Sequence, residues 1–372
     1  MSFEKLCGQY AYVNNMVRLY NKLQDDQSKE IFWARLQFEA EPNLDHALAL
    51  GALSGLWPEE EKLDWKSEFE NAVSTGKKIV LYGAGAAGQT FANLVLNSGA
   101  DFYAFCDRKK SGTIVCGKSV LQPEEIVKCS EHYAVVICTT DYYEEILQFL
   151  RDSKFPQGSI LRCSALFSAK ESAVQYCEFS ERLRSGTAIV DAGCYDGVDT
   201  IRFYHWCDGT CSKIYAFEPD ESNYDHCAVS IKEAGLPNVA LIKAGLSDVT
   251  GEATFASASN MGSYLVHTDQ IKLNFTYPDA EISTIHTVRL DDIVDTEIGL
   301  IKMDIEGTEF DALHGAKEVI QRDRPLLAIC VYHRQGDMLA IMDHLQDLVP
   351  EYRFWIRHYE TLSSGTVLYA AV

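Results

Sequence analysis

The sequence predicts an α/β protein with two Rossmann-like sheets, and three observations support this fold class. Apolar strand-like runs alternate with helical patterns from Lys77 onward, which is typical of parallel sheets covered by helices. Two glycine-containing loops, at Gly83 and at Gly193, each follow such a run. The chain has 372 residues, which is long for one domain, so we expect two or three.

The composition is that of a globular protein and disfavours some partners. Hydrophobic residues make up 47% of the chain and charged residues 23%. The net charge of -21 repels phosphate backbones and anionic lipids, so we expect no nucleic acid and no membrane as a partner. The twelve cysteines lack C-x-x-C or zinc-ligand spacing, and no signal-peptide pattern or membrane-length apolar stretch is visible. A cytoplasmic location is therefore expected.

Residues 1–75 are predicted to form a helical N-terminal segment. Apolar residues recur at helical spacing between Val13 and Tyr20 and again between Leu44 and Leu56. The segment carries no chemical motif. We interpret it as a cap or an oligomerisation element that could support a homodimer.

Residues 76–163 are predicted to form a small Rossmann-like nucleotide-binding domain. The expected elements are strands at 78–82, 102–107 and 133–139 and helices at 86–98 and 142–152. Gly83, Gly85 and Gly88 form a G-x-G-x-x-G loop, and Asp107 ends the next strand, as in dinucleotide sites. Three interpretations remain open: a site for the nucleotide part of a carrier-linked acceptor such as a nucleotide sugar, a regulatory site for a dinucleotide such as NAD, or an empty scaffold.

A helical connector, residues 164–185, is expected to lead into a longer α/β series at 186–372. Its parallel strands are predicted at 187–191, 213–218, 239–244, 300–304 and 326–332. Two further strands, 352–358 and 366–371, are joined by a short loop and should pair antiparallel. A parallel sheet that ends in such a C-terminal hairpin is the arrangement of a class I methyltransferase fold.

The second glycine loop differs from a dinucleotide loop. It reads D-x-G-x-x-x-G, with Asp191 at the end of the strand and glycines at Gly193 and Gly197. A carboxylate there would repel a pyrophosphate but suits S-adenosylmethionine, which carries an ammonium and a sulfonium and no phosphate. Glu218 ends the second strand, where it can accept both ribose hydroxyls. The other predicted cofactor contacts follow the third strand: Ala244, Gly245 and Asp248. The competing interpretation is a generic sheet whose loop carboxylates face solvent.

The second half of the chain resembles the FkbM-type methyltransferases. The resemblance rests on the segments IVDAGCYDGVDT, YAFEPD, AGLSDVTGEATF and, most specifically, LIKMDIEGTE, which is similar to the family signature K-x-D-x-E-G-x-E. It covers about residues 186–372. It implies an S-adenosylmethionine-dependent O-methyltransferase that acts on a hydroxyl of a sugar, a glycan or a natural product. Cys194 and Tyr195 stand where the family has smaller residues, so the loop is expected to differ in shape.

The candidate catalytic residues are Asp304, Glu306 and His333, which follow strands whose carboxyl ends converge on the ligand crevice. His333 is the predicted general base because its ordinary pKa lies near neutrality. Asp304 is expected to orient the acceptor hydroxyl or to contact the methionine ammonium. Glu306 and Glu309 take part in the chemistry or only complement a helix dipole. Asp304 and Glu306 are also suited to a divalent ion, but no third ligand is evident, so no metal is predicted.

The acceptor is expected to lie beside a long polar insertion at about 260–279, which is interpreted as a lid or acceptor wall. Ser263 and Tyr264 are the candidate contacts, and a plain surface excursion is the alternative. His358 and Tyr359, at the end of a late strand, are further acceptor contacts or packing residues.

Two other functions compete with methyl transfer. An oxidoreductase or dehydratase using the first loop would bind NAD(H) or a nucleotide sugar, but no Tyr-x-x-x-Lys or comparable dyad accompanies that loop. A non-enzymatic nucleotide sensor would bind a ligand without methyl transfer, and the complete KMDIEG segment and Glu218 weigh against it. The identity of the acceptor, a small molecule or a glycan, depends on pocket shape rather than on motif.

Overall fold

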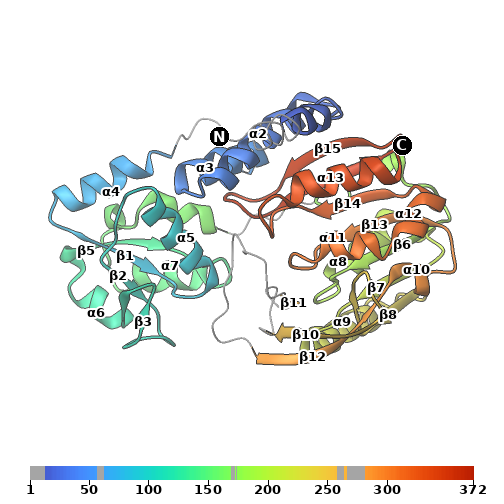
Figure 1. The fold of residues 1–372 in the computed structure, drawn as a ribbon. Helices are drawn as coiled ribbons and strands as arrows, with labels where there is room; N and C mark the ends of the chain where they lie inside the picture. Colours follow the sequence, from blue (N-terminus) through green and yellow to red (C-terminus); the bar gives the residue numbers. More distant parts are fainter. Residues whose placement is uncertain (1–12, 57–62, 169–171, 173, 258–263, 266–280) are drawn as a thin grey trace. The chain divides into compact units, whose positions relative to one another are not determined.

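The computed structural model describes residues 13–56, 63–168, 172, 174–257, 264–265 and 281–372, and they form two compact units (Figure 1). The first unit combines residues 1–33, 173–358 and 364–372. The second combines residues 34–172 with the short segment 359–363. The chain therefore passes between the units more than once, so neither unit is a single continuous piece of sequence.

The N-terminal residues are divided between the two units after residue 33, whereas the sequence predicted one helical segment that ends at residue 75. Helix α2 (Asp26–Ala40) begins in the first unit and ends in the second, which also holds α3 (Leu44–Gly51) and α4 (Trp65–Ser74). In the first unit, Leu23 forms a parallel bridge with Phe354. Apolar periodicity indicates α3, but it does not indicate α2 or the sheet on which each helix packs.

The first unit is built on a seven-stranded sheet within the described residues, in the order β15-β16-β14-β13-β6-β7-β8. The strands are β6 (Ala188–Ala192), β7 (Ile214–Phe217), β8 (Val239–Ile242), β13 (Ile298–Met303), β14 (Leu326–Cys330), β15 (Arg353–His358) and β16 (Thr366–Ala371). Every neighbouring pair is parallel except those of β16, which is antiparallel to both β14 and β15. The predicted class I methyltransferase sheet with a C-terminal hairpin is confirmed.

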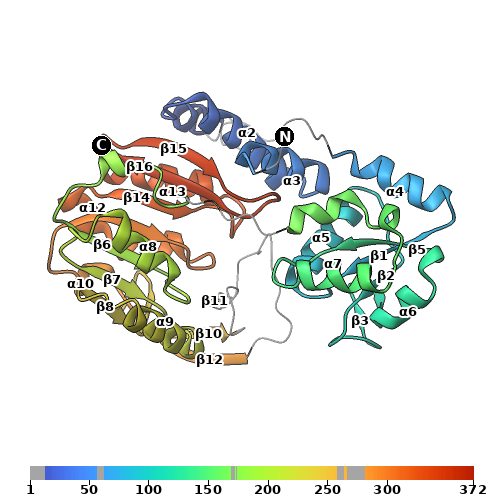
Figure 2. The same ribbon diagram turned by 180° about the vertical axis from the view of Figure 1, so that it is seen from behind.

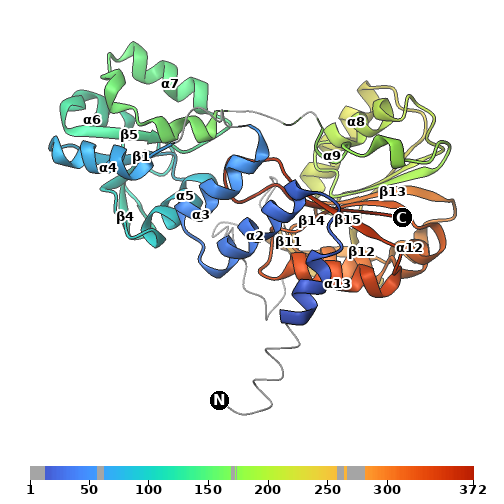
Figure 3. The same cartoon turned by 90° about the horizontal axis from the view of Figure 1, so that it is seen from above.

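Helices cover both faces of this sheet because its central strands are buried throughout and need apolar cover on each side. Helices α8 (Val198–Trp206) and α9 (Glu221–Glu233) lie on one face (Figure 2). On the other lie α12 (Lys317–Asp323) and α13 (Asp337–Leu348) (Figure 3). The short helices α10 (Leu290–Ile293) and α11 (Glu309–His314) contact α12 and α13, respectively (Figure 1). In the part of the chain that the structure describes, no helix has the length and apolar character needed to cross a membrane.

A small additional sheet, β11-β10-β12-β9, is not predicted by the sequence. It consists of β9 (Gly245–Leu246), β10 (Gly251–Ser257), β11 (Tyr264–Leu265) and β12 (Glu281–Val288). Strands β10 and β12 pair antiparallel along seven residues each. The predicted lid at 260–279 lies outside the described residues except for β11.

The second unit has the predicted βαβ core and several further elements. Its sheet has the order β3-β4-β2-β1-β5, and β1, β2 and β5 are parallel. The strands are β1 (Lys78–Tyr82), β2 (Ala104–Cys106), β3 (Ile114–Val115), β4 (Lys118–Leu121) and β5 (Tyr133–Ile137), and the helices are α5 (Ala86–Asn97), α6 (Pro123–Lys128) and α7 (Tyr143–Asp152). Alternate residues of β1 pack against α5 on one face and against α6 and α7 on the other.

The predicted connector, 164–185, is less helical than expected. Its described part contains only the 3-10 turns η4 (Arg162–Phe167) and η5 (Ser180–Arg182). The stretch between them returns the chain to the first unit and carries Tyr176 into the crevice at the strand ends.

Candidate active site

The second glycine loop runs from β6 into α8 and needs glycine at two positions. Gly193 and Gly197 have φ values of +76° and +85°, in the left-handed region that favours glycine. A Cβ atom at Gly193 would lie 2.0 Å from the carbonyl oxygen of Asp304. The loop lies directly against the end of β13, and only a glycine at position 193 permits this close approach.

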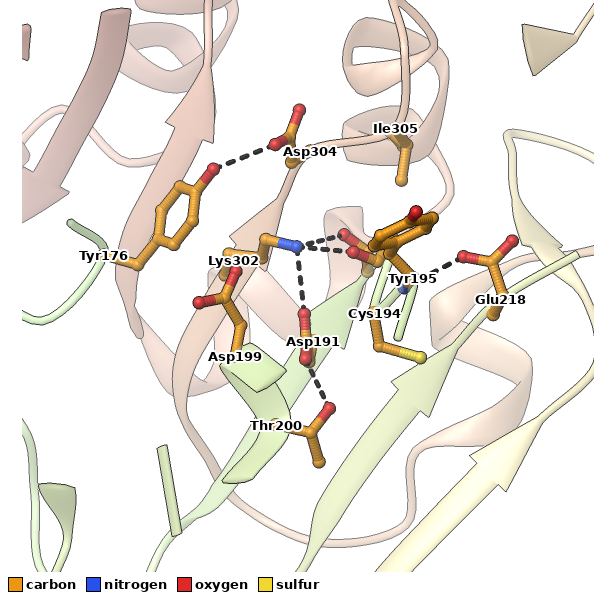
Figure 4. Close-up of polar contacts among 12 residues, drawn as sticks. Tyr176, Asp191, Cys194, Tyr195, Asp199, Thr200, Glu218, Lys302, Asp304 and Ile305 are labelled. Carbon is orange, nitrogen blue, oxygen red and sulfur yellow. Dashed lines mark hydrogen bonds and ion pairs between the residues drawn. The ribbon is translucent and has the colours of Figure 1, made fainter. Parts of the chain in front are cut away.

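A buried ion pair between β13 and β6 holds this loop in place (Figure 4). Lys302 on β13 stands opposite Asp191 on β6, and its Nζ lies 3.1 Å from Asp191 Oδ1. The same Nζ donates to the carbonyl oxygens of Ala192 at 3.2 Å and Gly193 at 2.6 Å. Asp191 Oδ2 accepts from Thr200 Oγ1 at 2.6 Å.

This geometry corrects the predicted role of Asp191. Its side chain is completely buried and its charge is paired with Lys302, so it does not face a cationic ligand. Burial alone would lower the pKa of Lys302, but the carboxylates of Asp191, Asp199 and Asp304 outweigh burial and raise that pKa. Lys302 is thus a permanent cation that fixes the shape of the loop, a role that its place in the K-x-D motif could have indicated.

Asp199, in the first turn of α8, is a candidate cofactor contact that the sequence analysis overlooks. Its side chain is 26% exposed and is paired with Arg202 at 3.1 Å. Burial raises its pKa to about 6, although Lys302 opposes the rise. Unlike Asp191, it is a carboxylate of this loop region that a ligand can reach.

Glu218 ends the second strand, as predicted, and its carboxylate binds the loop backbone. Glu218 Oε2 accepts from the N–H of Tyr195 at 3.0 Å, and Oε1 accepts from the N–H of Asp220 at 2.9 Å. The side chain is 5% exposed, and burial raises its pKa to about 7. The side chain of Asn223 also donates to this carboxylate, which leaves one lone pair that can accept a ribose hydroxyl.

The three predicted cofactor contacts after the third strand, Ala244, Gly245 and Asp248, are not equivalent. Ala244 and Gly245 are buried at the end of the third strand, and a Cβ atom at Gly245 would lie 3.9 Å from Pro219, next to Glu218. Asp248 is exposed and lies beside Gly315, at the end of α11. Gly245 therefore lies near Glu218, the predicted ribose contact, whereas Asp248 does not.

Asp304 reaches the crevice from the end of β13, held by two tyrosines. Its Oδ2 accepts from Tyr176 Oη at 2.9 Å (Figure 4) and its Oδ1 accepts from Tyr332 Oη at 3.2 Å. The side chain is 27% exposed. Burial would raise its pKa, but His333 and Lys302 lower it, so the carboxylate is ionised. No motif indicates the role of Tyr176, because it comes from the connector.

His333 lies among three carboxylates. Its Nδ1 is 2.8 Å from Glu309 Oε1, and its Nε2 is 3.3 Å from Asp304 Oδ1 and 3.7 Å from Glu306 Oε1. The imidazole is 4% exposed and Glu309 is fully buried. Glu309 Oε1 also accepts from the N–H of Ile305 at 3.0 Å, so Glu309 does more than complement a helix dipole.

These contacts do not suit His333 as a general base. Burial alone would lower its pKa, but Glu309, Glu306 and Asp304 raise it to about 10. The imidazole is therefore protonated at neutral pH in the absence of another cation, and a protonated imidazole cannot accept a proton. The prediction relied on the ordinary pKa of histidine, which three nearby carboxylates change.

Three non-glycine residues of the crevice have left-handed backbone conformations. The φ values are +65° at Tyr176, +48° at Tyr195 and +57° at Glu306. Each such residue costs roughly 1–3 kcal/mol, which the surrounding structure must offset. Backbone strain of this kind is concentrated where ligands bind.

The predicted acceptor contacts are only partly described. Ser263 lies outside the described residues, and only the backbone of Tyr264 is placed, in β11. His358 is 2% exposed, and its Nδ1 bonds Thr366 Oγ1 across the β15–β16 hairpin at 2.9 Å, which is a packing role. Tyr359 is buried and belongs to the second unit.

The first glycine loop, in the second unit, is explained by packing. A Cβ atom at Gly88 would lie 1.9 Å from the carbonyl oxygen of Gly83, and one at Gly83 would lie 2.9 Å from that of Cys138. Gly85 has open space around it. Asp107 Oδ2 accepts from the N–H of Ala84 at 3.0 Å, so the acid holds the loop itself.

Two segments of the chain match models of known protein families. Residues 191–359 match the model of the methyltransferase FkbM domain, and residues 75–161 match a model described as C2185-like, N-terminal. The chain is 26% identical over 176 residues to the 2-O-methyltransferase NoeI of Sinorhizobium fredii, which covers 42% of this chain and 70% of the relative. Nothing in these matches supports NAD or a nucleotide sugar at the first loop.

Solved structures of methyltransferases are also similar. The methyltransferase FkbM from Methylobacillus flagellatus is 16% identical with a TM-score of 0.48, over 93% of this chain and 99% of that one. SMU.1697c, a methyltransferase-like protein from Streptococcus mutans in complex with SAH, is 15% identical with a TM-score of 0.35, over 55% of this chain and 99% of that one.

Proposed function

We propose that this chain, whose residues 191–359 form an FkbM-type methyltransferase domain, transfers a methyl group from S-adenosylmethionine to a hydroxyl oxygen of a sugar, a glycan or a natural product. The observation that carries the proposal is the placement of the Gly193 loop, Glu218 and Asp304 at adjoining carboxyl ends of β6, β7 and β13. The match to a 2-O-methyltransferase supports oxygen as the atom that is methylated.

The described residues suit S-adenosylmethionine better than a dinucleotide. The lysine beneath the loop, Lys302, points its ammonium at backbone carbonyls and Asp191, so it is not available to a pyrophosphate. Two reachable side chains around the loop are carboxylates, Asp199, which is paired with Arg202, and Asp304, and they attract the positively charged groups of the cofactor. Glu218 provides the acceptor for ribose hydroxyls.

The residues of the chain bind and orient the two reactants. Bound S-adenosylmethionine supplies an electrophilic methyl carbon on a positively charged sulfur. Asp304, ionised and held by Tyr176 and Tyr332, accepts the hydrogen bond of the acceptor hydroxyl and keeps its oxygen about 3 Å from the methyl carbon. The positive charge of His333 keeps Asp304 ionised. The acceptor proton passes along its hydrogen bond to the Asp304 carboxylate as the oxygen–carbon bond forms, and the electrons of the breaking sulfur–carbon bond stay on sulfur.

The first test is calorimetric titration of the purified chain with S-adenosylhomocysteine, with NADH and a set of nucleotide sugars in parallel. We expect micromolar binding of S-adenosylhomocysteine. Absence of that binding together with tight binding of NADH would contradict the proposal.

The second test is transfer of a labelled methyl group to a panel of sugars, glycans and phenolic natural products. Asp304→Asn should keep its affinity for S-adenosylhomocysteine within a few-fold and lose at least about 100-fold in transfer. Asp347→Asn, the same change at an exposed aspartate of α13, should retain full transfer. Mass spectrometry of the product distinguishes a methyl ether from a methyl ester or amine, and either of the latter would rule out hydroxyl methylation.

A further inference from the structure

The group formed by Asp304, Glu306, Glu309 and His333 contains two buried polar atoms whose hydrogen-bonding capacity is not used. His333 Nε2 and Glu309 Oε2 have no hydrogen-bond partner among the described residues. His333 is 4% exposed and Glu309 is fully buried. Leaving buried polar atoms without partners costs about 1–3 kcal/mol each, so a missing partner is indicated at this position.

We propose that Asp304, Glu309 and His333 bind one divalent metal ion. One ligand atom from each of these residues lies within 4.8 Å of the others. Ligand bonds of roughly 2.0–2.6 Å allow a metal ion to join atoms that are up to about 4–5 Å apart. One imidazole nitrogen with carboxylate oxygens suits Mn²⁺, Fe²⁺ or Zn²⁺ better than Mg²⁺ or Ca²⁺.

The orientation of the imidazole ring supports this site. Glu309 Oε1 lies 2.8 Å from His333 Nδ1, so it fixes the proton on that nitrogen and directs Nε2 toward Asp304, 3.3 Å away. A carboxylate on the far nitrogen of a metal-binding histidine is the usual way in which such a ring is oriented.

The local sequence builds this arrangement from a tight turn between β13 and α11. Glu306 and Gly307 have φ values of +57° and +93°, so the chain reverses immediately after Asp304. A Cβ atom at Gly307 would lie 3.3 Å from the Cβ of His333. The turn therefore packs against His333, which brings Glu309 back to the strand end that carries Asp304.

A proton at His333 Nε2 is the alternative to a metal ion. A protonated imidazole would neutralise part of the surrounding carboxylate charge, as its contacts with Asp304 and Glu306 allow. It would leave Glu309 Oε2 without a partner. Metal titration separates the two possibilities, because an imidazole that keeps its proton binds no ion.

The role of the ion rests on the proposed function, although its binding does not. An ion held beside Asp304 can also coordinate the acceptor hydroxyl and lower the pKa of that hydroxyl. This would supply the activation that a carboxylate of low basicity such as Asp304 provides only weakly.

The decisive experiment titrates the EDTA-treated full chain with Mn²⁺ and with Zn²⁺ by calorimetry. We expect one ion per chain, bound in the micromolar range. Glu309→Gln should weaken binding by about 10–100-fold. Glu351→Gln, the same substitution at an exposed position, should leave it unchanged.

A second readout identifies the nitrogen ligand. The electron paramagnetic resonance spectrum of bound Cu²⁺ should show nitrogen hyperfine structure in the wild-type chain and lose it in His333→Gln, with circular dichroism confirming that both variants are folded. No ion binding, or binding that is unchanged in both variants, would overturn the site. Binding of S-adenosylhomocysteine can be measured in EDTA, without the ion. Absence of that binding would refute the proposed function and leave the metal site untouched.

Discussion

The loop at Gly83 and the loop at Gly193 each follow the first strand of a parallel sheet, and in each an acid from the next strand binds the loop backbone. Asp107 accepts from Ala84 N–H, and Glu218 accepts from Tyr195 N–H, both at 3.0 Å. In each loop a glycine also permits a close approach to a neighbouring carbonyl. Glycines and an adjacent acid are therefore a way of joining a strand to a helix, and they do not identify a ligand site by themselves.

The two loops differ in the strands beneath them. Under the first, Leu81 stands opposite Val136 on the neighbouring strand. At the corresponding place under the second, Asp191 stands opposite Lys302, and both are buried. Burying a charged pair costs several kcal/mol before the two charges attract each other. A buried charged pair in place of an apolar one is therefore the main structural difference between the two loops.

The largest expected effect comes from Lys302→Met, which leaves Asp191 buried without its partner. We expect a loss of about 3–5 kcal/mol in the free energy of unfolding of the first unit and no binding of S-adenosylhomocysteine. The double variant Asp191→Leu with Lys302→Met, which gives the second loop an apolar pair as the first loop has, should recover most of the stability but none of the binding. Hydrogen exchange, which reports each unit separately, and calorimetry check both. Retained binding in the double variant would break the distinction between the loops.

Alanine at a crowded glycine of each loop should destabilise only the unit that contains it. A Cβ atom would lie 2.0 Å from a backbone carbonyl at Gly193 and 1.9 Å from one at Gly88. We expect each substitution to cost more than about 3 kcal/mol in its own unit. Gly193→Ala should abolish binding of S-adenosylhomocysteine, whereas Gly88→Ala should leave its Kd within about twofold. Equal losses of binding would show that the first loop contributes to the cofactor site.

The two loop acids should differ in their effect on the cofactor. Glu218→Gln removes a charged acceptor of ribose hydroxyls and should weaken binding of S-adenosylhomocysteine by about 10–100-fold. Asp107→Asn should not change this affinity. Titration calorimetry measures both variants, and a similar loss in each would mean that Glu218 acts only on the loop backbone.

The affinity for S-adenosylhomocysteine should also depend on pH through Glu218. Burial raises the pKa of this group to about 7, and the ionised form is the one that accepts a ribose hydroxyl hydrogen bond in addition to its three protein contacts. Binding should therefore weaken as the pH falls from 8 to 6, by up to about tenfold. Glu218→Gln should remove this dependence, and a pH profile that survives in that variant would assign the titration to another group.

The smallest effect is expected at Gly85. Its surroundings are open, and its φ of -76° is accessible to any residue. Gly85→Ala should change the free energy of unfolding by less than about 0.5 kcal/mol. NADH should bind neither the wild-type chain nor this variant. NADH binding that Gly85→Ala weakens would restore the first loop as a dinucleotide site.

Much of the fold could be predicted because its local signals are strong. The apolar runs of β1 and β16 have the predicted bounds, and the short loop before β16 correctly indicates an antiparallel hairpin. The small β9–β12 sheet could not be predicted in the same way. It forms around a polar insertion, and its pairing joins segments with no shared pattern.

The site was less accessible to prediction because it depends on register and on distant contacts. The sequence places Asp191 at a strand end, but only the pairing of β6 with β13 shows that Lys302 lies beside it. His333 is found as a titratable residue at a strand end, yet its protonation depends on Glu309, twenty-four residues away. Tyr176 belongs to no motif at all, since an irregular connector brings it to Asp304.

The division of the N-terminal helices has a practical consequence for anyone who wishes to isolate the catalytic part. Before it enters the second unit, the chain lines β15: Gln24 N–H donates to the carbonyl oxygen of Phe354 at 3.1 Å, and Arg357 Nη2 pairs with Asp25 at 2.7 Å. A truncation that starts at residue 186 would remove this cover and leave an unprotected edge strand, which promotes aggregation. A shortened version should therefore keep residues 13–33 and replace 34–172 with a linker.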